Sequence, residues 1–523
     1  MVIKVILLIV FFAVMMGIGI YSRNKAKNVN DYVLGGRTVG PWISAFAFGT
    51  SYFSSVVFIG YAGQFGWKFG LASTWIGLGN AFIGSLLAWL ILGRRTRLMT
   101  QQLDAKTMPE YFGKRYNSKS LRLAGSVIAF IFLVPYTAGV YNGLSRLFGM
   151  AFSVDYRICV IVMALLTGAY VVIGGYMATA LNDFIQGIIM LIGICAVIGA
   201  VLHGQGGFLN AVKELSLIET DPSVTTEALQ GGTGLFASFF GPDPLSLLGV
   251  VVLTSLGTWG LPQMVQKFYA IKDEKAVKTG TVVSTFFAII IAGGCYFLGG
   301  FGRLFKDVPG VVNTAADGTV SVAYDNIVPS MLSTLPDILI GIVVVLVFSA
   351  SMSTLSSLVL TSSSTLTLDL IKPLMKNNMK EKTQLRMMQA FVMFFIIISV
   401  VIAFNPPTFI AQLMGISWGA LAGAFLAPFM YGLYSKNITK AAVWASYIVG
   451  VGFTLANIIA GKFGKPIIAS PINAGAAMMI AGLIVVPIVS AITAKPDRAK
   501  VDEMFTCYDK TVTVPETENL GRS

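Results

Sequence analysis

The sequence has few charged residues for its length. Of its 523 residues, only 12% are Asp, Glu, Lys or Arg, whereas soluble domains carry about 25%. Hydrophobic residues make up 55%, and the mean hydropathy is +0.77. So few charges cannot cover so much apolar surface in water, which excludes a soluble enzyme, a disordered chain and a fibrous protein. The composition predicts an all-α membrane protein that crosses the bilayer many times.

Histidine and cysteine are also scarce. The single histidine, His203, follows an apolar run, which argues against a histidine-based metal site or proton relay. Cys159, Cys195 and Cys295 lie inside apolar runs and Cys507 in the tail, so no extracellular disulfide framework is expected. The chain also lacks the paired carboxylates and metal-ligand spacings that a membrane enzyme needs. We therefore expect no enzymatic activity, no catalytic residues and no organic cofactor.

Apolar stretches near 20 residues in length alternate with polar loops along the chain. Such stretches are long enough to cross a bilayer as helices. Thirteen membrane helices are predicted, at residues 2–22, 41–66, 72–92, 123–149, 157–176, 183–202, 246–270, 279–301, 336–368, 388–404, 408–434, 441–460 and 472–494. The first stretch also resembles a signal peptide. A basic loop follows it, however, and no small-residue cleavage site is evident, which favours an uncleaved helix.

Basic residues gather in alternate loops. These loops are 23–40, 93–122, 271–278, 369–387 and 435–440. The longest loop on the other side, 203–245, is mainly acidic. This asymmetry accounts for the net charge of +13 without nucleic-acid binding, and it predicts an outside N-terminus and a cytoplasmic C-terminus in the plasma membrane. The expected partners are a small solute, Na⁺ and the lipid bilayer, with no obligate protein partner.

Two predicted helices have sequences that disfavour a continuous helix. The second contains FGTSYFSSVVFIGYAG (Phe48–Gly63), which is rich in Ser and Gly. The seventh contains LTSLGTWGLPQ (Leu253–Gln263), where Gly257, Gly260 and Pro262 interrupt helical structure. Small residues also allow close helix packing, so neither sequence alone indicates a site. Their separation by five helices, however, is the spacing of two inverted five-helix repeats with a transport site at the breaks.

The repeat spacing also predicts how the chain is divided. The expected units are an extra first helix with its basic loop (1–40), a first repeat (41–202), an outer loop (203–245), a second repeat (246–434), two further helices (435–494) and a cytoplasmic tail (495–523).

Polar residues at membrane depth are candidates for ion binding. Asp183 begins the predicted helix 183–202, either as an ion ligand or as an N-terminal aspartate stabilised by the helix dipole. The run SASMSTLSSLVLTSSS (Ser349–Ser364) concentrates hydroxyl groups, which suit a hard cation but also bond to their own helix. Arg146, at the end of a helix, is expected to extend toward the outer face.

Three motifs resemble the sodium:solute symporter family, in its proline/pantothenate branch. NDYVLGGRTVGP (Asn30–Pro41) looks like the loop before the family's first core helix, and YVVIGGYMATALNDFIQGIIMLIG (Tyr170–Gly193) is similar to its most recognisable signature. ASMSTLSSLVLTSSS (Ala350–Ser364) looks like its ion-binding helix. The resemblance covers roughly residues 3–495. It implies a LeuT-type five-plus-five inverted-repeat fold with 13 helices and alternating access driven by co-transported Na⁺.

The resemblance also implies ion ligands. The family's main Na⁺ site carries over onto the carbonyls of Thr50, Phe53 and Ala350 and the hydroxyls of Ser353 and Thr354. Some members have a second Na⁺ site, whose pattern carries over onto Asp183, Ser356 and Ser357.

The expected substrate is a small solute with a carboxylate. Proline symporters of the family carry an aspartate at the position of Tyr52, whereas Trp259–Gly280 and Leu181–Leu215 look more like pantothenate symporters. We therefore expect a pantothenate-like solute first, then proline or another amino acid or monocarboxylate. The alternatives are a sodium-coupled sugar symporter, a proton-coupled transporter and a channel-like protein of the same fold. Candidate substrate contacts are Tyr52, Ser54, Ser55, Gly60, Thr254, Thr258 and Ser417.

Overall fold

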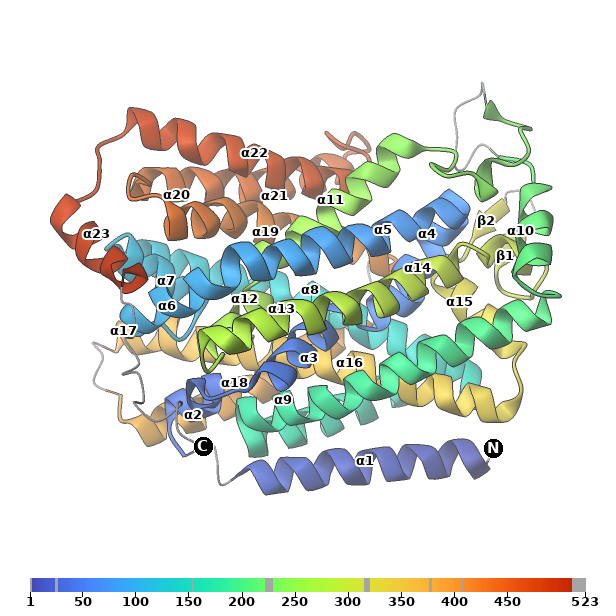
Figure 1. Cartoon of the computed structure of the whole chain (residues 1–523), viewed down its shortest axis with the longest axis horizontal. Helices are drawn as coiled ribbons and strands as arrows, with labels where there is room; N and C mark the ends of the chain where they lie inside the picture. Colours follow the sequence, from blue (N-terminus) through green and yellow to red (C-terminus); the bar gives the residue numbers. More distant parts are fainter. Residues whose placement is uncertain are drawn as a thin grey trace, which may run out of the picture.

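The computed structural model describes residues 2–23, 27–152, 155–221, 229–314, 320–375, 379–405 and 408–509. Part of the predicted outer loop and most of the predicted tail lie outside these residues. Long helices run side by side across the molecule (Figure 1). One end carries α10 and the antiparallel hairpin of β1 (Val312–Thr314) and β2 (Val320–Val322), and we call it the hairpin end. The other carries α6, α7 and α23, and we call it the α7 end.

The helices follow the predicted order along the chain. The first half comprises α1 (Val2–Ser22), α2 (Val29–Leu34), η2 (Gly35–Arg37), α3 (Pro41–Tyr52), η3 (Val56–Tyr61), α4 (Ala62–Phe69), η4 (Gly70–Ser73), α5 (Thr74–Gly79), η5 (Asn80–Leu87), η6 (Trp89–Gly93), α6 (Arg94–Gln102), α7 (Met108–Arg115), α8 (Lys119–Phe152), α9 (Tyr156–Gly204), α10 (Phe208–Ser216) and η8 (Leu235–Ala237). The second half comprises α11 (Pro244–Gly260), α12 (Pro262–Tyr269), α13 (Glu274–Ala288), η9 (Ile289–Gly293), α14 (Gly294–Gly299), η10 (Gly302–Phe305), α15 (Tyr324–Ser333), α16 (Asp337–Thr365), η11 (Leu366–Ile371), α17 (Lys372–Leu374), α18 (Glu381–Phe404), α19 (Ile410–Tyr434), α20 (Lys440–Tyr447), η12 (Ile448–Gly452), α21 (Phe453–Lys462), α22 (Pro471–Ile492), α23 (Arg498–Phe505) and η13 (Thr506–Tyr508).

Within the described residues, ten helices are long and apolar enough to cross a membrane, and the bent pair α11–α12 makes eleven. Two of the ten, Val56–Gln102 and Tyr156–Gly204, contain 47 and 49 residues. Straight helices of that length would measure about 70 Å, more than twice the ~30 Å hydrocarbon core. Each contains a glycine with positive φ, Gly70 (60°) and Gly175 (55°). Dividing both segments at these glycines, and joining α3 to residues 56–69, gives the thirteen predicted crossings.

The turn within α9 brings its two halves alongside the same neighbours. Tyr170, before the turn, donates to Met352 O on α16 at 2.8 Å. Gly187, after the turn, packs on Thr50 of α3, whose carbonyl contacts Thr354 of α16. Two positions 17 residues apart therefore lie at the same depth, as in a helical hairpin. The second half begins next to Gly175 rather than at Asp183, where the sequence predicted the start of the helix.

Both predicted helix breaks are present. α3 ends at Tyr52, and Phe53 is extended, with φ −101° and ψ 90°. α11 and α12 meet at Leu261, with ψ 120°, and their axes differ by 47°. Pro262 explains the second break, because proline lacks an N–H and keeps the preceding residue out of the helical region. At the first break, Ser54 Oγ accepts from Val56 N at 3.2 Å and competes with helical bonding.

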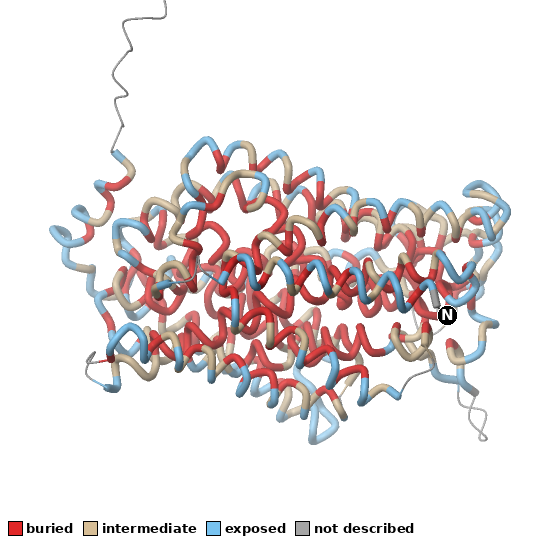
Figure 2. The backbone as a smooth tube through the Cα atoms, turned by 90° about the horizontal axis from the view of Figure 1, so that it is seen from below, coloured by how far each residue is buried: buried red, intermediate tan, exposed pale blue. Residues whose placement is uncertain are grey.

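α16 forms the centre of the molecule, packed by α3, α8, α9 and α18. Buried backbone concentrates in this middle layer, whereas the periphery is exposed (Figure 2). Near the hairpin end, α4 and α14 touch through glycines. A Cβ added at Gly66 would lie only 1.9 Å from Gly299 O, so these two backbones are in direct contact.

Candidate functional site

The hydroxyl of Thr354 lies against the end of α3. The helix stops at Tyr52, so the carbonyls of its last turn lack helical partners. Thr354 Oγ1, on α16, is 3.3 Å from Thr50 O and 3.2 Å from Ser51 O. It is also 3.2 Å from Ala350 O on its own helix. Because one hydroxyl hydrogen serves only one of three carbonyls, this cluster has more acceptors than donors, as an oxygen site for a hard cation requires.

Two more predicted ligands adjoin this cluster. Ser353 precedes Thr354, and its buried hydroxyl has no hydrogen-bond partner among the described residues. Phe53 is the first residue beyond α3, is fully buried, and stacks its ring on Tyr52 at 4.3 Å. Of the five residues that the resemblance assigns to the main Na⁺ site, Thr50, Ala350 and Thr354 are in contact where α3 ends beside α16, and Phe53 and Ser353 lie close to them in sequence.

The second predicted set has a different composition. Asp183 is fully buried, and its Oδ2 lies 3.3 Å from Nζ of Lys267, whose side chain is 3% exposed. Asp183 Oδ1 has no hydrogen bond within 3.5 Å among the described residues, but the hydroxyl of Ser353 lies close enough to interact with this carboxylate. Ser356 donates to Ser353 O at 2.9 Å, and the Ser357 hydroxyl bonds to that of Ser51 at 2.8 Å.

Asp183 is not the N-terminal residue of a helix, so that alternative interpretation of the sequence is wrong. The second half of α9 begins next to Gly175, which places Asp183 two turns inside it. The favourable field of a helix N-terminus is confined to about the first turn. The partner of this carboxylate is a side chain on α12, not the end of its own helix.

Lys267 was missed by the sequence interpretation. It lies within the predicted helix 246–270, whereas the neighbouring lysines of 271–278 were assigned to a basic loop. A charged residue inside a predicted span is itself a signal of function, so Lys267 could have been identified from the sequence. Its pairing with Asp183, which lies 84 residues away, could not have been identified in this way.

The predicted substrate residues connect the two broken helices with their neighbours. The Tyr52 hydroxyl donates to Thr254 O, which joins the end of α3 to α11. Other hydroxyls also donate to backbone carbonyls: Ser55 to Val140 O, Thr254 to Val250 O, Thr258 to Gly84 O and Ser417 to Phe132 O. Ser54 bonds within the break itself, and Gly60 packs on Ile410 at the start of α19, toward the hairpin end. All seven residues are buried.

Several buried polar atoms near the breaks lack partners. Both amide atoms of Gln263, the second residue of α12, have no hydrogen-bond partner among the described residues, nor has the indole N–H of Trp418. The Trp418 ring lies 6.0 Å from that of Tyr52 and 5.7 Å from that of Tyr136. Such atoms are costly to bury unless a ligand satisfies them. The position of Gln263 directly after the Gly–Leu–Pro break was a signal in the sequence.

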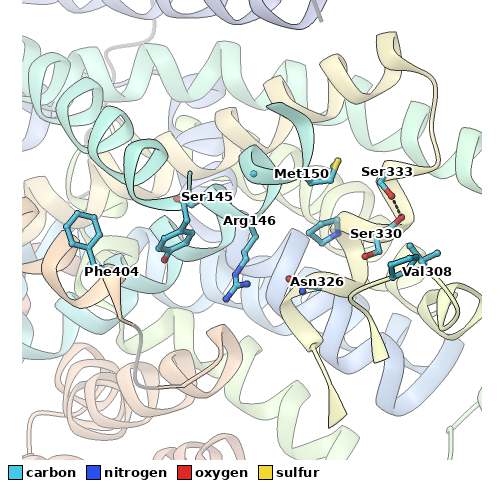
Figure 3. Close-up of a pocket in the computed structure, with 12 residues that line it drawn as sticks. Ser145, Arg146, Met150, Val308, Asn326, Ser330, Ser333 and Phe404 are labelled. Atoms are coloured by element: carbon cyan, nitrogen blue, oxygen red, sulfur yellow. Dashed lines mark hydrogen bonds between the residues drawn. The ribbon is translucent and has the colours of Figure 1, made fainter. Parts of the chain in front are cut away.

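A cavity of about 560 Å³ opens between α8 and α15 toward the hairpin end (Figure 3). Its lining includes Arg146, Ser145 and Asn326 and none of the predicted substrate residues. Asp325 precedes Asn326 in the sequence, and its carboxylate accepts a hydrogen bond from Ile410 N at 3.3 Å. Burial raises the pKa of Asp325 to about 6, although the Ile410 N–H and the Arg146 charge act in the opposite direction.

Comparisons with known proteins agree with this geometry. The sodium:solute symporter family matches residues 32–450. The chain is 28% identical to the osmoregulated proline transporter of Bacillus subtilis, over 94% of this chain and 95% of that protein. It is 30% identical to the sodium/pantothenate symporter of Escherichia coli (85% and 88% covered) and 29% identical to a sodium/proline symporter of Staphylococcus aureus (85% and 84%).

A solved structure shows the same fold. The substrate-bound, outward-open form of a Na⁺-coupled sialic acid symporter superposes with a TM-score of 0.73 at 17% identity, over 95% of this chain and 99% of that one. The LeuT-type fold expected from the sequence is thereby confirmed. From the family match, the shared fold and the two broken helices together, we conclude that this chain is a multi-pass membrane protein of the sodium:solute symporter family, whose members couple solute transport to Na⁺.

Proposed function

We propose that this symporter imports a small carboxylate-bearing solute by alternating access, with a pantothenate-like solute as first choice and proline, another amino acid or a monocarboxylate next. The single observation that carries the proposal is the oxygen cluster around Thr354. It joins the end of α3, at a helix break, to the central helix α16. An ion held there ties the break closed, so ion binding is coupled to the shape of the neighbouring solute site.

The proposed Na⁺ ligands are the carbonyls of Thr50, Phe53 and Ala350 and the hydroxyls of Ser353 and Thr354. In support, Thr354 faces three carbonyls with one hydrogen, and the hydroxyl of Ser353 has no partner among the described residues. The cluster has more neutral oxygens than hydrogen-bond donors. Such a cluster suits the binding of Na⁺ better than the transport of protons.

The proposed solute position is the region between the two breaks. Tyr52 and Thr254 bound it, and the unpartnered amide of Gln263 and indole of Trp418 supply hydrogen bonds. The amide NH₂ suits a carboxylate oxygen, and the amide oxygen suits a hydroxyl or N–H of the solute. The relatives transport proline or pantothenate by name, and both of these solutes carry a carboxylate.

The hairpin end is proposed to face outward. In support, the arginines of α6 and the lysine and arginine of α7 lie at the opposite end, as the positive-inside rule requires of a cytoplasmic face. The cavity that contains Arg146 then opens to the outside and offers a cation to an arriving carboxylate (Figure 3). A proton-coupled cycle is the second candidate, because the buried Asp183–Lys267 pair contains two titratable groups.

Uptake into proteoliposomes tests the proposal. Labelled pantothenate, proline and a short monocarboxylate are each offered with an inward Na⁺ gradient, and again with choline and an inward proton gradient. We expect Na⁺-driven accumulation of one solute, lost in Ser353→Ala/Thr354→Ala. Ser363→Ala is the matched control, since this buried hydroxyl on α16 bonds to Leu360 O of its own helix. Accumulation that needs only protons would overturn the Na⁺ assignment.

A further inference from the structure

Lys267 places its amino group beside the buried carboxylate of Asp183. Its Nζ lies 3.3 Å from Asp183 Oδ2, and the two side chains are 3% and 0% exposed. The ring of Tyr176 lies 5.2 Å from the same nitrogen. The ammonium is therefore held between a carboxylate and an aromatic ring in the interior of the protein.

Asp183 is also the one charged member of the second cation set predicted from the sequence. We propose that the ammonium of Lys267 takes the place of a second Na⁺ at Asp183, so that the protein binds one Na⁺ per transport cycle. This inference rests on the proposed function, because it assumes that the cluster around Thr354 holds the first Na⁺.

The contacts of the other two predicted ligands support the substitution. The Ser356 hydroxyl donates to Ser353 O, and the Ser357 hydroxyl bonds to that of Ser51. Neither of these hydrogen bonds involves Asp183, so the group paired with the carboxylate is the ammonium of Lys267. The remaining anionic oxygen, Asp183 Oδ1, lies on a carboxylate whose charge the ammonium already balances.

Electrostatic repulsion makes the two cations mutually exclusive. A Na⁺ bound to Asp183 would sit about 4 Å from the ammonium, where two like charges in a partly buried site repel strongly. That repulsion corresponds to a loss of Na⁺ affinity of roughly a thousandfold. The cluster around Thr354 consists of neutral oxygens, and the adjoining Asp183–Lys267 ion pair adds no net charge to it.

A single Na⁺ has a consequence for the driving force. One Na⁺ with a zwitterion moves one net charge, so 100 mV of membrane potential adds roughly fiftyfold to the accumulation. One Na⁺ with a monoanion moves no net charge, so a tenfold Na⁺ gradient supports only about tenfold accumulation. The proposal therefore predicts electrogenic uptake of an amino acid and electroneutral uptake of a monocarboxylate such as pantothenate.

Equilibrium binding of ²²Na⁺ to the purified full-length protein tests the inference. We expect one Na⁺ per chain in the unmodified protein and two in Lys267→Met, in which an apolar side chain of similar length frees Asp183. Lys267→Arg, which keeps the charge, and the double variant Asp183→Asn/Lys267→Met, which removes both charges, should each bind one.

Each outcome decides a different point. Two Na⁺ in the unmodified protein, or one in a folded Lys267→Met, overturns the role of the ammonium and leaves the proposed function standing. No Na⁺ in the unmodified protein overturns the proposed function itself. If Lys267→Met does not fold, the binding ratio of the unmodified protein still decides. Transport currents give an independent readout, because a monoanion that carries inward positive current contradicts one Na⁺ per cycle.

Discussion

Two fully buried carboxylates, Asp183 in the middle of the molecule and Asp369 toward the α7 end, have opposite surroundings. Asp369 accepts from Arg122 Nε at 2.8 Å on one oxygen and from the Thr107 hydroxyl on the other. The same arginine also lies 3.3 Å from Glu110. Asp183 has one ammonium at 3.3 Å and one oxygen without a hydrogen-bond partner among the described residues.

The difference separates a carboxylate that is hydrogen-bonded on both oxygens from one that is paired on a single oxygen. Arg122 joins α8 to η11, which continues from α16, with a planar guanidinium that serves several acceptors in one fixed geometry. Lys267 is a point charge on a flexible stem and satisfies only part of its partner. A saturated pair stabilises one conformation, whereas a partly satisfied pair can be rearranged at less cost during a transport cycle.

Removal of the arginine that binds Asp369 should have the largest effect. Arg122→Ala leaves Asp369 buried without its cation, which should lower the free energy of unfolding by about 3–5 kcal/mol. Thermal unfolding in detergent measures the loss, and Na⁺ binding by the protein that remains folded should be unchanged. A loss below about 1 kcal/mol would contradict a stabilising role of this pair.

The neutral oxygen cluster should respond in binding rather than in stability. Thr354→Ala removes one proposed Na⁺ ligand worth about 1.5–3 kcal/mol, so Na⁺ affinity should fall roughly 10- to 100-fold. Thr354→Ser keeps the hydroxyl and is the matched control. Titration of Na⁺-dependent uptake measures both variants, and equal Na⁺ affinities in the two would remove Thr354 from the site.

A third carboxylate, Asp325, extends the comparison to the hairpin end. Its pKa is raised from 3.8 to about 6, so the folded protein binds this proton more tightly than the unfolded chain does. The free energy of unfolding should therefore fall as pH rises through this range, by about 1 kcal/mol between pH 5 and 7. Unfolding measured across pH should show this slope, and Asp325→Asn should remove it. A slope that persists in the variant must come from another group.

An uncharged side chain with unpartnered atoms should give the smallest effect. Gln263→Leu removes one neutral hydrogen-bonding group next to the α11–α12 break, worth about 0.5–1.5 kcal/mol. The solute concentration for half-maximal uptake should rise about two- to tenfold, while the ratio of bound Na⁺ stays the same. An unchanged concentration dependence would place the solute elsewhere.

Local chemistry explains what the sequence could predict. Pro262 interrupts a helix whatever its neighbours are, and the hydroxyl-rich run of α16 predicts a candidate oxygen site without knowledge of its partners. The start of the second half of α9 was misplaced because the turn at Gly175 lies within an apolar run and has no polar loop to mark it. The Asp183–Lys267 pair could not be predicted, because only tertiary packing brings α9 against α12.

The glycine contact between α4 and α14 has a mechanical consequence. Because backbone meets backbone at Gly66 and Gly299, neither segment can roll or slide over the other without collision. A movement of the half of the broken helix beyond Phe53 would therefore displace α14 as well. Its natural pivots are the extended residues after α3 and the wide π-helical turn η9 that joins α14 to α13. A bulky residue at either glycine would force α4 and α14 apart and remove this coupling, while both pivots remained intact.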